Sequence, residues 1–183
     1  MPISNILDII IKGSGSVAVI IAIWQLFHSW KKRRVDMYWK IAEIYLSKES
    51  RESRQALDEL LNKMPNLKTY LESKQKDKQT RNNLINEFIT RFHNAQQGTK
   101  EKEICTKART RLRFLHQTGI IYKKNLIDKK LLFELIGTGF EIDFPILDII
   151  IEGYRRPHNF PKMYNYFEYL WLKYHKWKKY NYK

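Results

Sequence analysis

An uncharged segment near the N-terminus constrains this chain more than any other feature. The 18 residues from Gly13 to Trp30 contain no Asp, Glu, Lys or Arg. A helix rises 1.5 Å per residue, so this segment would extend about 27 Å, which is just sufficient to cross the hydrocarbon core of a bilayer. The sequence therefore predicts one N-terminal transmembrane helix. An amphipathic helix that lies in the membrane interface is the alternative.

The basic cluster that follows this segment sets its predicted orientation. Lys31, Lys32, Arg33 and Arg34 come directly after it, whereas Lys12 is the only basic residue before it. Basic residues flank membrane helices on the cytoplasmic side. We therefore expect the N-terminus outside and the rest of the chain in the cytoplasm. We expect no cleaved signal peptide, because no small-residue cleavage site precedes the basic cluster.

Small and polar residues recur along one side of the predicted membrane helix. Steps of three and four residues place five of them on one stripe: Ser14, Ala18, Ala22, Gln25 and Ser29. The apolar residues of the segment favour insertion by only about 3 kcal/mol in total. In lipid, small residues let helices approach closely, and polar side chains prefer a partner helix or a water-filled lumen. The stripe predicts either an ordinary packing face or self-association around a pore.

The remainder of the chain has the composition of one basic folded domain. The chain is 43% hydrophobic and 14% aromatic, which is ample for a core. Residues 35–183 carry 29 basic and 18 acidic side chains, a net charge of +11. Such a charge attracts anionic lipid or RNA. We predict two parts: an anchor with its basic stop at residues 1–34, and a basic, all-helical cytoplasmic domain at residues 35–183.

Apolar residues in this domain repeat at intervals of three and four, which predicts an all-α bundle. Helices are expected at 35–47, 51–63, 66–74, 79–97, 100–124, 128–138, 144–155 and 161–180. Ser50 and Asp128 are predicted N-caps. Pro145 and Pro161 suit first turns. Breaks are expected at three glycines: Gly98, Gly137 and Gly139.

Two of the expected helices have a clear apolar face. The helix at 100–124 carries the most regular one, which predicts a central element: Ile104, Ala108, Leu112, Leu115, Gly119 and Tyr122. The last helix carries a second apolar face, which we assign first to the core: Met163, Phe167, Leu170, Tyr174 and Trp177. Its remaining aromatic residues lie beside lysines, so contact with a membrane surface or with single-stranded nucleic acid stays open.

One pattern could carry chemistry. The sequence has no Gly-rich phosphate loop, no metal-binding spacing of Cys and His, and no nucleophile elbow, so neither a metal nor a cofactor is expected. Arg111 and His116, in RLRFLH, are separated by four residues, and Arg109 gives a six-residue version. This spacing resembles the R-x4-6-H signature of the HEPN superfamily of helical-bundle proteins, which includes ribonucleases. The resemblance implies that His116 acts as general base and Arg111 stabilises phosphate charge.

This pattern departs from an active site in two ways. Residues five apart on a helix point about 140° away from each other, whereas Arg109 and His116 share a side. Leu112 also stands where active relatives often carry a polar residue. A catalytic pair, a retained structural or RNA-contacting motif and a coincidence are the three interpretations.

The whole arrangement resembles a known family. A membrane helix, a small basic helical domain and one R-x4-H pattern are together similar to the small membrane accessory protein of type VI-B CRISPR systems. The segments RTRLRFLH, GIIYKKNLIDKKLLFELIG and PKMYNYFEYLW also resemble a broad group of bacterial membrane-anchored helical proteins. The first resemblance implies a pore-forming homo-oligomer in the bacterial inner membrane that enhances antiviral defence by an RNA-guided RNase. A membrane-tethered HEPN ribonuclease and a non-catalytic tether for RNA or a protein are the alternatives.

Overall fold

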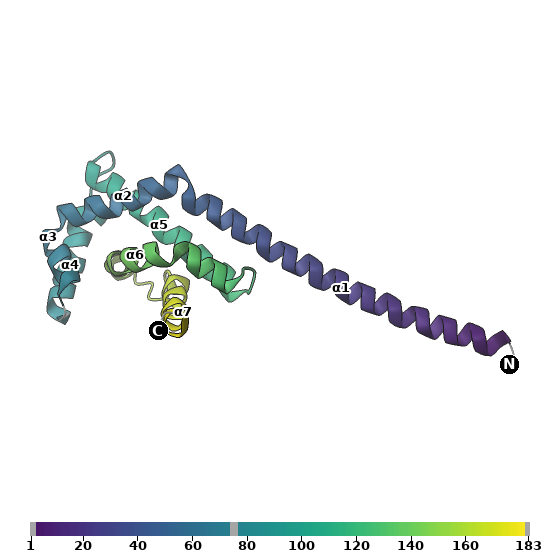
Figure 1. The fold of residues 1–183 in the computed structure, drawn as a ribbon. Helices are drawn as coiled ribbons and strands as arrows, with labels where there is room; N and C mark the ends of the chain where they lie inside the picture. Colours follow the sequence, from purple (N-terminus) through teal and green to yellow (C-terminus); the bar gives the residue numbers. More distant parts are fainter. Residues whose placement is uncertain (1–2, 74–76, 182–183) are drawn as a thin grey trace.

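The computed structural model describes the backbone of residues 3–73 and 77–181, and the side chains within these ranges from residue 21 onward. These ranges contain helices and no strand, so the predicted all-α fold is confirmed. The elements are α1 (Ile3–Leu46), α2 (Lys48–Lys63), α3 (Pro65–Glu72), α4 (Lys78–Phe88), the π-helical segment η1 (Ile89–His93), α5 (Lys100–Lys123), α6 (Lys129–His158) and α7 (Asn165–Asn181). Figure 1 shows α2 to α7 gathered into a bundle from which α1 projects.

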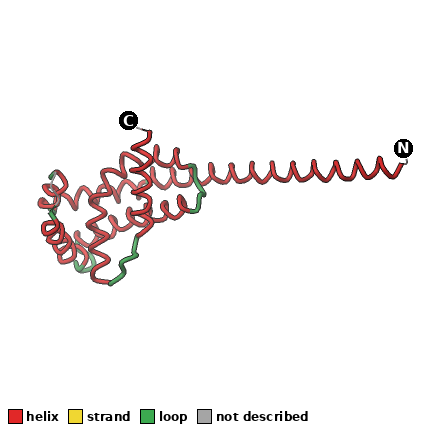
Figure 2. Tube along the Cα trace, turned by 90° about the horizontal axis from the view of Figure 1, so that it is seen from below, coloured by secondary structure: helices red, strands yellow, loops and turns green. Residues whose placement is uncertain are grey.

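Helix α1 is one continuous helix of 44 residues. Neither Gly nor Pro occurs between Val17 and Leu46, so no residue in this stretch breaks the helix. The helix predicted at 35–47 is therefore the last part of α1, which passes residue 34 without interruption. Among the side chains that the structure describes, those from Arg34 onward contact the bundle, and Ile41 and Ala42 are buried there. Figures 1 and 2 both show the N-terminal part extending alone, away from the other helices.

Helix α5 is the central element, as its apolar stripe predicts. It packs against α2 on one side and α7 on another. All six residues of the stripe are buried. Gly119 allows the close approach of α7, because a Cβ atom there would lie 2.1 Å from the carbonyl oxygen of Tyr166. The core assignment of α7 is also confirmed, since Phe167, Leu170 and Tyr174 are buried.

The predicted breaks at Gly137 and Gly139 are wrong, and the two helices expected at 128–138 and 144–155 form the single helix α6. These glycines serve packing instead. A Cβ atom on Gly137 would lie 2.9 Å from the ring of Tyr174, and one on Gly139 would meet the side chains of Arg54 and Tyr45. Pro145 lies inside α6 rather than in a first turn, although it offers no N–H to the preceding turn.

Several helix ends also differ from the sequence predictions. Ser47 caps α2 in place of Ser50, whose own N–H donates to the Ser47 hydroxyl at 3.1 Å. Pro161 lies in the turn before α7 rather than in its first turn. The helix expected at 79–97 ends at His93, where the chain leaves η1. Asp128 caps α6 as predicted, because its carboxylate accepts hydrogen bonds from the N–H groups of Lys130 and Leu131.

Candidate functional site

The projecting part of α1 exposes a continuous apolar surface. Large apolar side chains from residue 21 to residue 27 have exposed fractions of about one half or more: Ile21 49%, Ile23 61%, Trp24 64%, Leu26 71% and Phe27 63%. Their exposure shows that no described part of the bundle covers them. Contiguous exposed apolar surface of this kind marks a contact with a membrane or with another protein. This surface is therefore the first candidate site.

The predicted small and polar stripe lies on this helix. Ala22, Gln25 and Ser29 are exposed and share one side of α1 by their helical spacing, opposite Ile23 and Phe27. The side chains of Ser14 and Ala18, which belong to the same predicted stripe, lie outside the described residues.

The basic cluster divides into an exposed part and a part bound to the bundle. Lys31, Lys32 and Arg33 are exposed. Arg34 instead turns to the α5–α6 turn, where its Nη2 atom donates to the carbonyl oxygen of Ile127 at 3.0 Å and lies 3.8 Å from an Asp128 carboxylate oxygen. Three cations therefore surround α1 at the level where it joins the bundle.

Within the part of the chain that the structure describes, no helix meets the length and apolarity required of a membrane span. The predicted segment from Gly13 to Trp30 begins among residues whose side chains are outside that part.

A buried ion pair lies where the C-terminal end of α1 meets the bundle. Arg111 and Asp143 are each 1% exposed, and the Arg111 Nε atom donates to the Asp143 carboxylate at 2.7 Å. The Arg111 Nη1 atom donates to the Ser50 hydroxyl at 3.0 Å, and the guanidinium carbon lies 4.8 Å from the centre of the Tyr45 ring. Arg54 adds a second cation, 3.8 Å from Asp143. Arg111 thus joins α1, α2, α5 and α6 at one point.

Burial dominates the electrostatics of this pair. Removal from water raises the pKa of the Asp143 carboxyl, and the Arg111 guanidinium acts against this rise. A charged pair this deep in a protein is stabilised by its hydrogen bonds and is sensitive to the loss of either partner. Through these contacts, Arg111 fixes the relative positions of four helices.

His116 lies in a different environment from Arg111. Its ring stands edge-on to the rings of Tyr164 and Tyr166, with centroid distances of 5.6 and 5.4 Å. Burial lowers the pKa of His116, and a hydrogen bond with the Tyr164 backbone acts in the opposite direction. Arg109 reaches the same tyrosine, since its Nε atom donates to the Tyr164 hydroxyl at 3.3 Å. The structure therefore brings Arg109, rather than Arg111, to the neighbourhood of His116.

Sequence reasoning missed two residues of these clusters. Asp143 could have been found, because helical spacing places this carboxylate in one row with the apolar residues Phe140, Leu147 and Ile150. Tyr164 offered no such signal. It adopts a left-handed conformation with φ of 60° just before α7, and only the folded chain places it against α5.

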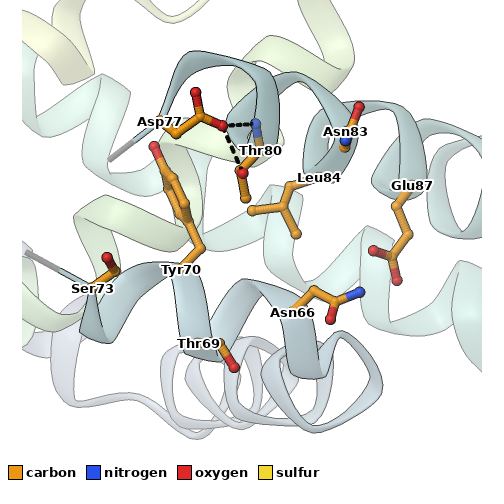
Figure 3. A pocket seen from close by; sticks show the side chains of 9 residues that line it. All are labelled: Asn66, Thr69, Tyr70, Ser73, Asp77, Thr80, Asn83, Leu84 and Glu87. Carbon is orange, nitrogen blue, oxygen red and sulfur yellow. Dashed lines mark hydrogen bonds between the residues drawn. The ribbon is translucent and has the colours of Figure 1, made fainter. Parts of the chain in front are cut away.

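A cavity with a volume of about 420 Å³ lies between α3 and α4 (Figure 3). Its walls are mainly hydroxyl, amide and carboxyl side chains: Asn66, Thr69, Tyr70, Ser73, Asp77, Thr80, Asn83, Leu84 and Glu87. The Asp77 carboxylate caps α4 and accepts from the Thr80 N–H at 2.6 Å. The Thr80 N–H and hydroxyl lower the pKa of Asp77. Asp77 therefore acts as a helix cap. Neither His nor Cys is among the described residues that line the cavity.

No cluster of three or more His, Cys, Asp or Glu side chains placed to hold a metal ion occurs among the described residues.

Comparison with known proteins assigns the chain to a family. No curated protein and no solved structure matches it. A family model described as a domain of unknown function, DUF4760, matches residues 13–174. The match includes the uncharged N-terminal segment from its first residue, together with nearly all of the bundle, so both parts belong to one family unit. The chain is a member of the DUF4760 family.

Proposed function

We propose that this protein is an oligomeric membrane effector. In this proposal the segment from Gly13 to Trp30 of α1 enters the bilayer, associates with copies of itself through the small and polar stripe, and makes the membrane permeable. The bundle of α2 to α7 then lies on the cytoplasmic side. The observation that carries the proposal is the exposure of the apolar side chains from Ile21 to Phe27 on a helix that projects away from the bundle.

The energetics favour insertion with self-association over insertion of a lone helix. Each Val, Ile, Leu or Phe of the segment favours insertion by roughly 0.3 to 0.6 kcal/mol, a small total that polar residues reduce. Gln25 would lose its hydrogen bonds with water in hydrocarbon. Association of several copies places Gln25 and Ser29 against partner helices or in a lumen, where their polar groups are satisfied.

The basic residues support the orientation. Lys31, Lys32 and Arg33 follow the segment and are exposed, so they are available to the phosphates of the cytoplasmic leaflet. Arg34 faces the bundle and holds it close to this level.

We further propose that permeabilisation takes place in the bacterial inner membrane and enhances antiviral defence by an RNA-guided RNase. The support is the likeness in architecture to the accessory protein of type VI-B CRISPR systems. Cells that carry such an RNase and its guide are expected to survive phage infection better when this protein is present. Equal survival with and without the protein would remove this part of the proposal.

The ribonuclease alternative receives less support from the geometry. The Arg111 guanidinium is enclosed by Asp143, Ser50 and Tyr45, so it has no exposed surface for a phosphate. RNA cleavage without metal that His116→Ala abolishes would nevertheless establish it. RNA binding by the basic domain without any leak would establish the tether.

The direct test is leakage from vesicles that contain the full-length protein. Wild-type protein is expected to release a small trapped dye, and Gln25→Leu is expected to reduce the rate about tenfold or more, since one lost interhelical hydrogen bond is worth on the order of 1–2 kcal/mol per subunit contact. Gln117→Leu is the matched control, because it makes the same change at an exposed position of α5. Absence of leakage by the wild type, or equal leakage by Gln25→Leu, would overturn the proposal.

A further inference from the structure

We propose that the turn between α5 and α6, together with the helix ends that flank it (residues 123–131), is a second membrane contact that docks on the anionic phospholipid headgroups of the cytoplasmic leaflet. This inference rests on the proposed function, in which α1 enters the bilayer. It adds that the bundle itself recognises the membrane surface through a defined element.

The position of the turn follows from its connection to α1. Arg34 donates to the carbonyl oxygen of Ile127 and lies beside Asp128, so the tip of the turn is held at the level of residue 34. Trp30, the last residue of the proposed span, is four residues earlier, or about 6 Å along the helix axis. Figure 2 shows this connection directly beside α1 where the helix leaves the bundle, and Figure 1 agrees. The turn therefore lies at headgroup depth.

The turn combines apolar and basic side chains in the arrangement that a lipid interface favours. Leu126 in the turn and Leu131 in the first turn of α6 are 40% and 39% exposed. Two pairs of exposed lysines flank Leu126: Lys123 and Lys124 before it, and Lys129 and Lys130 after it. Leucines can enter the interface while the lysines bind phosphate groups, each for about 1 kcal/mol.

Local contacts engage the acidic group of the turn, although its side chain is 46% exposed. The Asp128 carboxylate accepts from the Lys130 and Leu131 N–H groups at the start of α6 and faces Arg34. Asn125, with φ of 57°, lets the chain reverse tightly so that Leu126 stands at the tip. Ile127 is fully buried and fixes the turn to the core. The outer surface of the turn therefore carries four exposed lysines against one partly exposed, hydrogen-bonded carboxylate, and its net charge is positive.

An anionic membrane fits this surface better than RNA does. The lysines of the turn lie near the level of the exposed cations Lys31, Lys32 and Arg33 of α1, because the next residue, Arg34, contacts the turn. A planar array of phosphates meets both sets at once, whereas the exposed leucines have no use in binding an RNA backbone.

The test places a fluorophore on the turn of the full-length protein. Leu126→Cys is labelled with a polarity-sensitive dye, and Cys105 is left unlabelled because it is buried. Leu172→Cys on α7, where the leucine is 68% exposed, is the matched control. In vesicles that contain phosphatidylglycerol, headgroup-bound nitroxide lipid is expected to quench the dye at residue 126 several-fold more than the dye at residue 172. In vesicles of phosphatidylcholine alone, this difference is expected to shrink.

The outcomes separate this inference from the proposed function. If the protein does not float with vesicles at all, the proposed function fails. If it floats but the two positions are quenched equally, the inference alone is overturned. Equal quenching at residue 126 in charged and uncharged vesicles would overturn recognition of anionic headgroups. Shielding of the dye from water by RNA but not by lipid would overturn it too. Replacement of Lys123, Lys124, Lys129 and Lys130 by Gln is expected to abolish the preference for phosphatidylglycerol.

Discussion

At the scale of single residues, the Arg111–Asp143 pair is the most consequential contact in the bundle. Arg111→Met leaves the Asp143 carboxylate in the core without its main partner, 1% exposed. Loss of one member of a buried pair costs about 3–5 kcal/mol. We expect the free energy of unfolding, measured by chemical denaturation in detergent, to fall by this amount. Arg113→Met, at an exposed position of the same helix, is the control and should change stability by less than about 0.5 kcal/mol.

A double variant tests whether the charge or the shape of the pair matters. Replacement of both partners by apolar residues, Arg111→Met with Asp143→Leu, removes the uncompensated charge. It is expected to recover most of the stability that Arg111→Met loses. A double variant as unstable as the single one would show that the hydrogen bond to Ser50 and the packing on Tyr45 dominate instead.

His116 makes the stability of the bundle depend on pH. Burial lowers the pKa of His116 below its ordinary value of 6.5, so folding favours the neutral ring over the charged one. The unfolded chain binds this proton more readily, so the stabilisation is complete above about pH 6.5 and declines as the pH falls through the folded pKa. We expect His116→Gln to flatten the pH dependence of unfolding below about pH 6.5 relative to the wild type. An unchanged slope of the unfolding free energy against pH would show that His116 is not its source.

At the scale of elements, the contact between α5 and α7 depends on one glycine. Gly119→Ala would place a Cβ atom 2.1 Å from the Tyr166 carbonyl oxygen, a backbone atom that cannot move without displacing α7. We expect destabilisation of about 1–3 kcal/mol despite the higher helix propensity of Ala. The control is Thr106→Ala, an exposed position on α5. Increased proteolysis of α7 in Gly119→Ala, but not in Thr106→Ala, would locate the effect.

The elements show which features of a sequence predict structure and which do not. The stripe of α5 and the cap at Asp128 were predictable because both depend on local spacing. The continuity of α6 was not. Gly137 and Gly139 indicate a break by propensity alone, but in the fold they lie inside α6 and leave room for Tyr174 and Arg54, which come from distant parts of the chain. The same limit applies to the candidate site, where Arg111 and His116 were recognisable but Tyr164 was supplied by tertiary packing.

At the scale of the whole molecule, the main feature is that α1 enters the bundle without a break in the helix. The two-part division at residue 34 remains a prediction, but a helix that runs from residue 3 to residue 46 connects the parts rigidly. Ile41 and Ala42 are buried in the bundle, while Tyr45 lies under Arg111. The direction of the small and polar stripe is thereby fixed relative to the surface of the bundle. In an oligomer, contacts between bundles and contacts between α1 helices must therefore have the same symmetry.

This rigidity makes helical phase testable. Two alanines inserted after Trp30 rotate the stripe by about 200° relative to the bundle, whereas four alanines rotate it by about 400° and return it close to its original direction. Both insertions lengthen the helix and leave Arg34 bound to the α5–α6 turn. We expect the two-residue insertion to abolish dye release and reduce oligomer size in detergent, and the four-residue insertion to retain much of both. Equal loss in the two variants would show that depth in the membrane, rather than helical phase, governs assembly, and equal retention would show that α1 and the bundle assemble independently.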